Sequence, residues 1–127
     1  MASRILIIDD NPINLELMAY LLESYGHGIL RAGDGEAGLE VVKRELPDLV
    51  ICDVHLPKMD GHELARRLKQ SDVPALRLIP LVAVTALAMS SDQENAIAAG
   101  FDGYISKPIV PENFVRQIES FMPEIRG

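Results

Sequence analysis

The feature that most constrains this chain is a regular alternation of short apolar runs with longer segments of helical periodicity. Most of the runs are strand-length and almost continuously hydrophobic, which is typical of a sheet buried on both faces. Strands that alternate with helices favour parallel pairing, because each helix returns the chain to the same edge of the sheet. The predicted strands are Ile5–Ile8, Ile29–Ala32, Leu49–Cys52, Leu81–Val84 and Asp102–Ser106. The pattern predicts one α/β domain of five βα units over residues 1–127.

Capping residues and breakers mark the helices between these strands. Asn11 suits the N-cap of the first helix, and Pro12 suits its first turn. Asp34 is expected to cap the second helix, Pro111 opens the last, and Pro74 and Pro80 bracket an irregular connection. Ser91 and Glu94 have the spacing of a capping box. The faces expected to point inward carry Leu15, Met18 and Leu22 in the first helix and Leu39, Val42 and Leu46 in the second.

Polar residues follow four of the five predicted strands directly. Asp9 and Asp10 follow the first strand, Asp53 the third, Thr85 the fourth and Lys107 the fifth. Because ligands of open parallel sheets bind beyond the carboxyl ends of the strands, these side chains should converge on one edge. Taken singly, each is more often a helix cap or a solvated surface group. Their joint occurrence predicts a site.

Three carboxylates, a hydroxyl and an ammonium group suit the binding of a phosphoryl group with a metal ion. Clustered carboxylates repel one another, and a divalent cation removes that conflict. Mg²⁺ prefers hard oxygen ligands and neutralises charge on a transferring phosphoryl group. A lysine and a threonine hydroxyl can hold phosphate oxygens, and a carboxylate can accept the phosphoryl group covalently.

Composition excludes several other classes of protein. The net charge of −7 argues against non-specific nucleic-acid binding, and no stretch approaches 18 consecutive apolar residues. We expect neither a membrane partner nor a signal peptide, since no charged segment and cleavage site precede the first strand. A lone cysteine, Cys52, fits a reducing cytoplasm.

Four segments, taken together and in this order, resemble the receiver domain of two-component response regulators. They are Asp9-Asp10-Asn-Pro, Asp53-x-x-Leu-Pro-x-Met-Asp-Gly61, Thr85-Ala86 and Tyr104-Ile-Ser-Lys107-Pro108. The resemblance covers essentially the whole chain and implies a flavodoxin-like fold with strand order 2-1-3-4-5 and helices on both faces. It extends to single-domain regulators of the chemotaxis and DivK types and to receivers of hybrid kinases.

The resemblance also assigns a role to each site residue. Asp53 is implied as the phosphoacceptor. Asp9, Asp10, Asp53 and the backbone carbonyl of His55 are implied as ligands of Mg²⁺. Thr85 and Lys107 would contact the phosphoryl group, and the Lys107–Pro108 bond would be cis.

The same resemblance implies a signalling mechanism rather than turnover of an external substrate. A histidine kinase or histidine phosphotransfer protein would donate the phosphoryl group. Thr85 and the switch aromatic Tyr104 would then move inward. A downstream protein effector would read the face formed by the fourth long helix, the fifth strand and the last helix. The chain would phosphorylate and dephosphorylate only itself.

Some residues depart from the family pattern or have no assigned role. His55 is less usual at its position and is expected to face solvent. Leu87, two residues beyond Thr85, is expected to hinder the hydrolytic water and to lengthen the phosphoryl lifetime. His27 and His62 are expected to be surface residues.

The sequence leaves two rival functions to be considered. A pseudo-receiver would bind partners without phosphorylation, but it should lack an acid, the threonine or the lysine. An aspartate-dependent phosphatase would want an Asp-x-Asp pair on the first strand, where this chain has Asp9-Asp10-Asn11. The chain suits either a stand-alone regulator or a domain of a larger protein.

Overall fold

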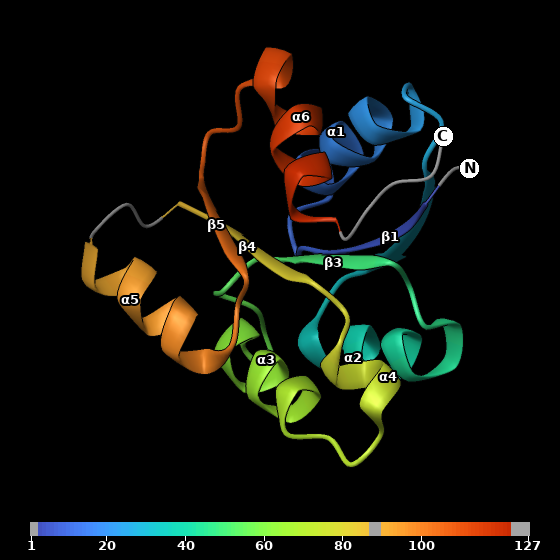
Figure 1. Cartoon of the computed structure of the whole chain (residues 1–127). Helices are drawn as coiled ribbons and strands as arrows, with labels where there is room; N and C mark the ends of the chain where they lie inside the picture. Colours follow the sequence, from blue (N-terminus) through green and yellow to red (C-terminus); the bar gives the residue numbers. More distant parts are fainter. Residues whose placement is uncertain (1–2, 87–89, 123–127) are drawn as a thin grey trace.

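Five parallel strands form one central sheet (Figure 1). The computed structural model describes residues 3–86 and 90–122, without the side chains of 90–93. The order of the strands is β2-β1-β3-β4-β5, as predicted. Their bounds are Arg4–Ile8 for β1, Gly28–Ala32 for β2, Leu49–Cys52 for β3, Leu81–Thr85 for β4 and Gly103–Ser106 for β5.

Helices cover both faces of the sheet (Figure 1). Helices α1 (Pro12–Glu23) and α6 (Pro111–Phe121) lie on one face. Helices α2 (Gly35–Glu45), α3 (Gly61–Lys69) and α5 (Ser90–Ala99) lie on the other, with the one-turn helix α4 (Pro74–Arg77). None of the helices in the described part of the chain has the length and apolar character to cross a membrane.

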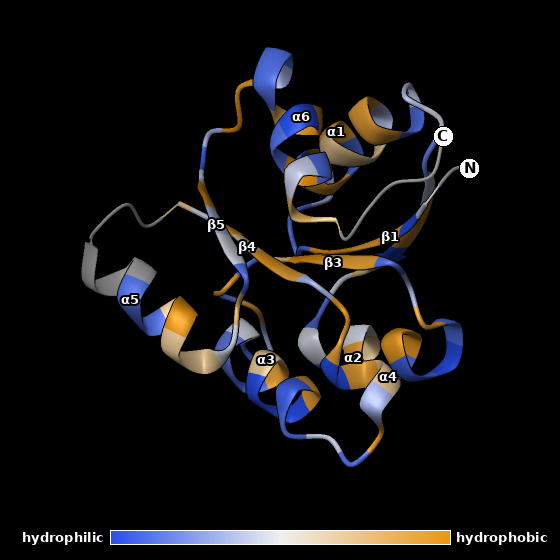
Figure 2. Cartoon of the chain, in the orientation of Figure 1, coloured by the Kyte–Doolittle hydropathy of each residue, from blue (hydrophilic) through white to orange (hydrophobic). Residues whose placement is uncertain are grey.

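The apolar strands build two cores because successive side chains of a strand point to opposite faces. In β1, Ile5 and Ile7 pack towards α1 and α6, whereas Leu6 and Ile8 pack towards α2 and α3. Figure 2 shows that the middle strands are hydrophobic along their length, whereas the helices carry both hydrophobic and hydrophilic residues. The central strands are therefore held from both sides, which makes their ends a rigid platform.

The predicted caps of the first two helices are present. The Asn11 side chain accepts hydrogen bonds from the backbone N–H groups of Ile13 and Asn14, and Asp34 accepts one from Ala37. Asp60 caps α3 in the same way by accepting from Glu63. These caps orient the loops that follow β1 and β3, which carry the acidic residues of the predicted site.

Two predictions about local structure were wrong. The segment between Pro74 and Pro80 contains the helix α4 rather than an irregular connection, because Pro74 suits a first helical turn. Leu46 is 47% exposed and does not share the buried face of Val42. It is the C-cap of α2 with a φ of 47°, so the chain leaves the helix before Leu46 can point inward.

The prediction that His27 lies on the surface was also wrong. Its side chain is buried, and its Nε2 atom lies 2.9 Å from Oε2 of Glu119 on α6. The partner is 92 positions away, so no local pattern could indicate it. His62 is half-buried, with its ring edge-on to Phe101. The predictions for Leu87 and for the side chain of Ser91 concern parts of the chain outside the described residues.

We predict that Glu119→Ala destabilises the fold by about 1–2 kcal/mol, because it leaves the buried His27 Nε2 atom without its partner. Urea unfolding at pH 7 measures the loss. Gln117→Ala, an exposed position on the same helix, is the matched control and should change stability by less than about 0.5 kcal/mol. Equal effects of the two substitutions would contradict the role given to the pair.

Gly35 should tolerate no side chain, although its backbone angles allow one. A Cβ atom there would lie 1.9 Å from the backbone oxygen of Met59, in the loop between β3 and α3. We expect Gly35→Ala to cost about 1–3 kcal/mol in the same unfolding measurement, through strain in that loop. At Gly33 a Cβ would meet nothing within 4 Å, so Gly33→Ala is the control. A Gly35→Ala variant as stable as Gly33→Ala would refute this packing argument.

Candidate functional site

The polar residues predicted from the strand ends meet at the carboxyl edge of the sheet. Asp9 follows β1, Asp53 follows β3, Thr85 ends β4 and Lys107 follows β5. Backbone hydrogen bonds continue the ladder past the strand ends, from Asp53 N–H to Ile8 (3.0 Å) and from Lys107 N–H to Thr85 (2.8 Å). The sheet itself therefore sets the spacing of these side chains.

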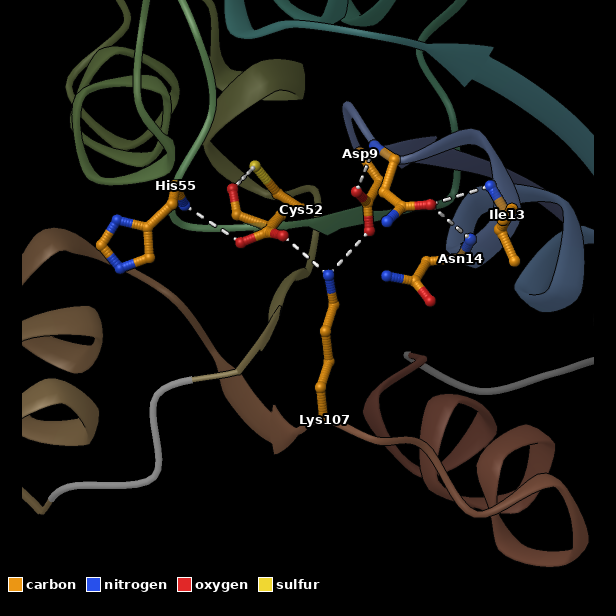
Figure 3. A network of polar contacts seen from close by, with 8 residues as sticks. Asp9, Ile13, Asn14, Cys52, His55 and Lys107 are labelled. Carbon is orange, nitrogen blue, oxygen red and sulfur yellow. Dashed lines mark hydrogen bonds and ion pairs between the residues drawn. The ribbon is translucent and has the colours of Figure 1, made fainter.

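The Lys107 ammonium group lies between two buried carboxylates (Figure 3). Its Nζ atom is 2.7 Å from Oδ2 of Asp53 and 3.0 Å from Oδ2 of Asp9. Asp9 is 2% exposed and Asp53 is 9% exposed, so neither charge is well solvated. The lysine therefore neutralises part of a charge concentration that would otherwise oppose folding.

Backbone amides hold the other oxygen of each carboxylate. His55 N–H donates to Oδ1 of Asp53 at 3.0 Å, and Asn11 N–H donates to Oδ1 of Asp9 at 2.9 Å. Both donors sit two residues beyond the acid they bind, in the first turn after a strand. The two carboxyl planes are thus fixed by local backbone geometry before any ligand arrives.

Asp10 completes a group of acids that could hold a metal ion. Single carboxylate oxygens of Asp9, Asp10 and Asp53 all lie within 4.8 Å of one another, and Asp10 is the exposed member. Hard oxygen donors at this spacing fit Mg²⁺, which keeps several of its waters in protein sites. The open side at Asp10 leaves room for those waters, so the residues present fit the ion.

Thr85 contributes an unsatisfied hydroxyl group to the same edge. Its side chain is 1% exposed, and Oγ1 has no hydrogen-bond partner within the described residues. A buried hydroxyl without a partner is costly and calls for an explanation. A ligand with acceptor oxygens beside Lys107 would supply the missing partner.

The remaining predicted residues lie around this centre. The Lys107–Pro108 peptide bond is cis. Tyr104 on β5 is half-buried against the core that faces α3 and α5. The His55 side chain is exposed and points away from Asp53, so only its backbone takes part in the site (Figure 3).

Electrostatics keep Lys107 charged and Cys52 neutral. Partial burial lowers the pKa of the lysine, but hydrogen bonds to Asp53 and Asp9 outweigh this and raise it above its ordinary value of 10.5. Burial, and then the charges of Asp53 and Asp9, raise the pKa of the Cys52 thiol well above its usual range. The thiol donates to the Asp53 backbone carbonyl and is unsuited to act as a nucleophile.

Two residues that had no predicted role of their own also shape the site. A Cβ atom at Gly61 would lie 2.7 Å from the backbone oxygen of Asp53, so only glycine allows α3 to start so close behind the acid. Asn14, on the first turn of α1, lines a pocket that Lys107 also lines. Gly61 closes the second segment of the resemblance, which assigns it no role, and no local pattern assigns a role to Asn14.

We predict that Lys107→Gln lowers stability by about 1–3 kcal/mol at pH 7, because two buried carboxylates lose their shared cation. The lysine pKa is higher in the folded than in the unfolded chain. Its contribution is therefore complete below about 10.5 and is lost as the pH rises through the raised value.

Urea unfolding of wild type and variant from about pH 6 to about pH 11.5, a range that spans the ordinary lysine pKa of 10.5, measures this difference. The gap should be constant up to about pH 10 and then close. Lys43→Gln, at an exposed position on α2, is the control. A gap that is absent at pH 7, or that widens at alkaline pH, would contradict the assignment.

Comparison with known protein families gives one match over most of the chain. The response regulator receiver domain model matches residues 5–119. A curated relative from Brucella anthropi, the polar-differentiation response regulator DivK, is 37% identical over 122 residues, which are 96% of this chain and 98% of the relative. The range matched by the family model contains the acidic edge described above and every strand except for Arg4, the first residue of β1.

Solved structures with the same fold include receivers from several contexts. A putative response regulator from Chloroflexus aurantiacus has a TM-score of 0.89 and 31% identity, covering 95% of this chain and 98% of that one. The signal receiver domain of a histidine kinase from Syntrophus aciditrophicus has a TM-score of 0.85 and 32% identity, covering 94% and 89%. The receiver of sensor histidine kinase PA1611 from Pseudomonas aeruginosa, with a TM-score of 0.85 and 28% identity, covers 95% and 98% and holds a magnesium ion in its active-site cleft.

Proposed function

Because this chain belongs to the response regulator receiver domain family, we propose that it accepts a phosphoryl group on Asp53 in a Mg²⁺-dependent step. Receiver domains are signalling modules of two-component systems rather than turnover enzymes. The donor would be a phosphohistidine of a histidine kinase or a histidine phosphotransfer protein. Similarity to receivers of histidine kinases supports this choice of donor.

One observation carries the proposal. Lys107 Nζ bridges Asp53 and Asp9, while the buried hydroxyl of Thr85, at the end of β4 between β3 and β5, has no partner within the described chain. A phosphoryl group on Asp53 would give both groups an acceptor oxygen. The site therefore has donors for an anion as well as acids for a cation, a combination that a purely structural ion pair does not need.

Each residue has a distinct part in the step. An Asp53 oxygen attacks phosphorus, and the His55 backbone N–H holds the other oxygen in place. Lys107 moves its charge from the carboxylates to the phosphoryl oxygens, and Thr85 donates to one of them. Asp9, Asp10, Asp53 and the His55 carbonyl would hold Mg²⁺, which when bound neutralises charge on the transferring group.

The output would pass through the face formed by α5, β5 and α6. Movement of Thr85 towards the phosphoryl group frees space that Tyr104 on β5 can occupy, which biases a two-state equilibrium of that face. A downstream protein effector would read the result. The acidic net charge of −7 favours a protein partner over a nucleic acid. A single buried cysteine agrees with a cytoplasmic setting.

Labelling by a small phosphodonor tests the proposal directly. With acetyl phosphate and Mg²⁺, the intact mass of the protein should increase by one phosphoryl group, and chelation of the metal should prevent it. Asp53→Asn should take up none, whereas Asp72→Asn, at an exposed position before α4, should label like the wild type. No labelling of the wild type would favour a pseudo-receiver, and turnover of a phosphate ester would favour a phosphatase.

Metal binding can be tested without phosphoryl transfer. Asp10→Asn should weaken Mg²⁺ binding roughly ten-fold or more, because the neutral amide removes an anionic oxygen from the set of three acids. Isothermal titration of the unphosphorylated protein gives the affinity. Asp72→Asn, at an exposed position before α4, serves as the control. Equal Mg²⁺ affinities of the two variants would rule out Asp10 as a ligand.

A further inference from the structure

A pocket of about 370 Å³ opens beside the site, between α1 and the segment that follows β5. It is lined by Asn14, Leu17, Met18, Ala86, Lys107, Pro108 and Ile109. Lys107 joins the pocket to the acidic centre, because its ammonium group contacts Asp53 and Asp9. A group that enters the pocket therefore lies next to Lys107 and Asp53, the residues that would hold a phosphoryl group.

The lining of the pocket is apolar apart from two residues. Lys107 is already engaged with the carboxylates, which leaves Asn14 as the neutral polar group of the lining. The Asn14 backbone N–H is held by the Asn11 cap, so the first turn of α1 fixes where the side chain starts. Its side-chain amide makes no hydrogen bond with the described residues and is half-buried. Figure 3 shows this amide on the Lys107 side of α1.

These features match one part of the proposed donor. An imidazole ring is flat and apolar on both faces, and when the phosphorylated ring is protonated it carries a single N–H, on the nitrogen that does not bear phosphorus. Aliphatic walls suit its faces, and one amide oxygen suits its N–H. We infer that Asn14 is a donor-recognition residue whose side-chain oxygen accepts a hydrogen bond from the imidazole of the phosphohistidine. This inference rests on the proposed phosphoryl transfer to Asp53.

The hydrogen bond would assist bond cleavage as well as binding. In the step, the phosphorus–nitrogen bond breaks, its electron pair stays on the ring nitrogen, and a new bond forms from phosphorus to the Asp53 oxygen. The other ring nitrogen keeps its proton, so neutral imidazole leaves and no further proton is required. Asn14 holds the ring in the protonated form that makes this possible.

Two small phosphodonors separate recognition of the ring from chemistry at Asp53. Phosphoimidazole carries the ring, whereas acetyl phosphate does not, and both deliver the same phosphoryl group. The readout is the ratio of the two labelling rate constants, measured with Mg²⁺ at one pH. In Asn14→Leu, which keeps the shape but loses the acceptor, the phosphoimidazole to acetyl phosphate ratio should fall about three- to ten-fold. Asn14→Ala should lower it similarly.

The control is Asn113→Leu, the same substitution in the first turn of α6 at an exposed position outside the pocket lining. Its ratio should equal that of the wild type. The inference is overturned if both Asn14 variants keep the wild-type ratio. This holds even if both labelling rate constants fall, as long as they fall by the same factor. Failure of the wild type to label with either donor would instead overturn the proposed function.

Discussion

The ion pairs from Lys107 to Asp53 and Asp9 connect the ends of β5, β3 and β1, which meet at one edge of the sheet because its strands are parallel. Two nearly buried carboxylates are unfavourable in a protein core unless a cation accompanies them. The fold meets this requirement with one lysine placed by the backbone of β5. Stability and the proposed reactivity would thus depend on the same charge, because any ligand that draws Lys107 away must compensate the two carboxylates.

This arrangement explains why the site is organised before a ligand binds. Backbone N–H groups of Asn11 and His55 fix one oxygen of each buried acid, while the second oxygen faces Lys107. Among the site residues, and within the described part of the chain, Asp10 and the Thr85 hydroxyl have no such hydrogen bond, so they would be the groups available to a hydrated cation and to an anion. Binding should therefore need little rearrangement of the two buried acids.

The sequence predicts the parts of the molecule that depend on local pattern and on strand ends. The caps at Asn11 and Asp34 and the convergence of Asp9, Asp53 and Lys107 follow from such signals. The strand order instead followed from the resemblance to receiver domains. What it cannot predict depends on distant partners or on small differences in backbone angle. His27 is buried because Glu119 reaches it from another helix, and Leu46 is exposed because α2 ends one residue early.

The central claim is that Asp53, among three neighbouring acids, receives the phosphoryl group. Reductive trapping distinguishes them, because borohydride converts an aspartyl phosphate to homoserine at the modified position alone. After labelling with acetyl phosphate and Mg²⁺, peptide mass spectrometry should find homoserine at position 53. Homoserine at position 9 or 10, or at none of the three positions in protein that carries the added mass, would contradict the account.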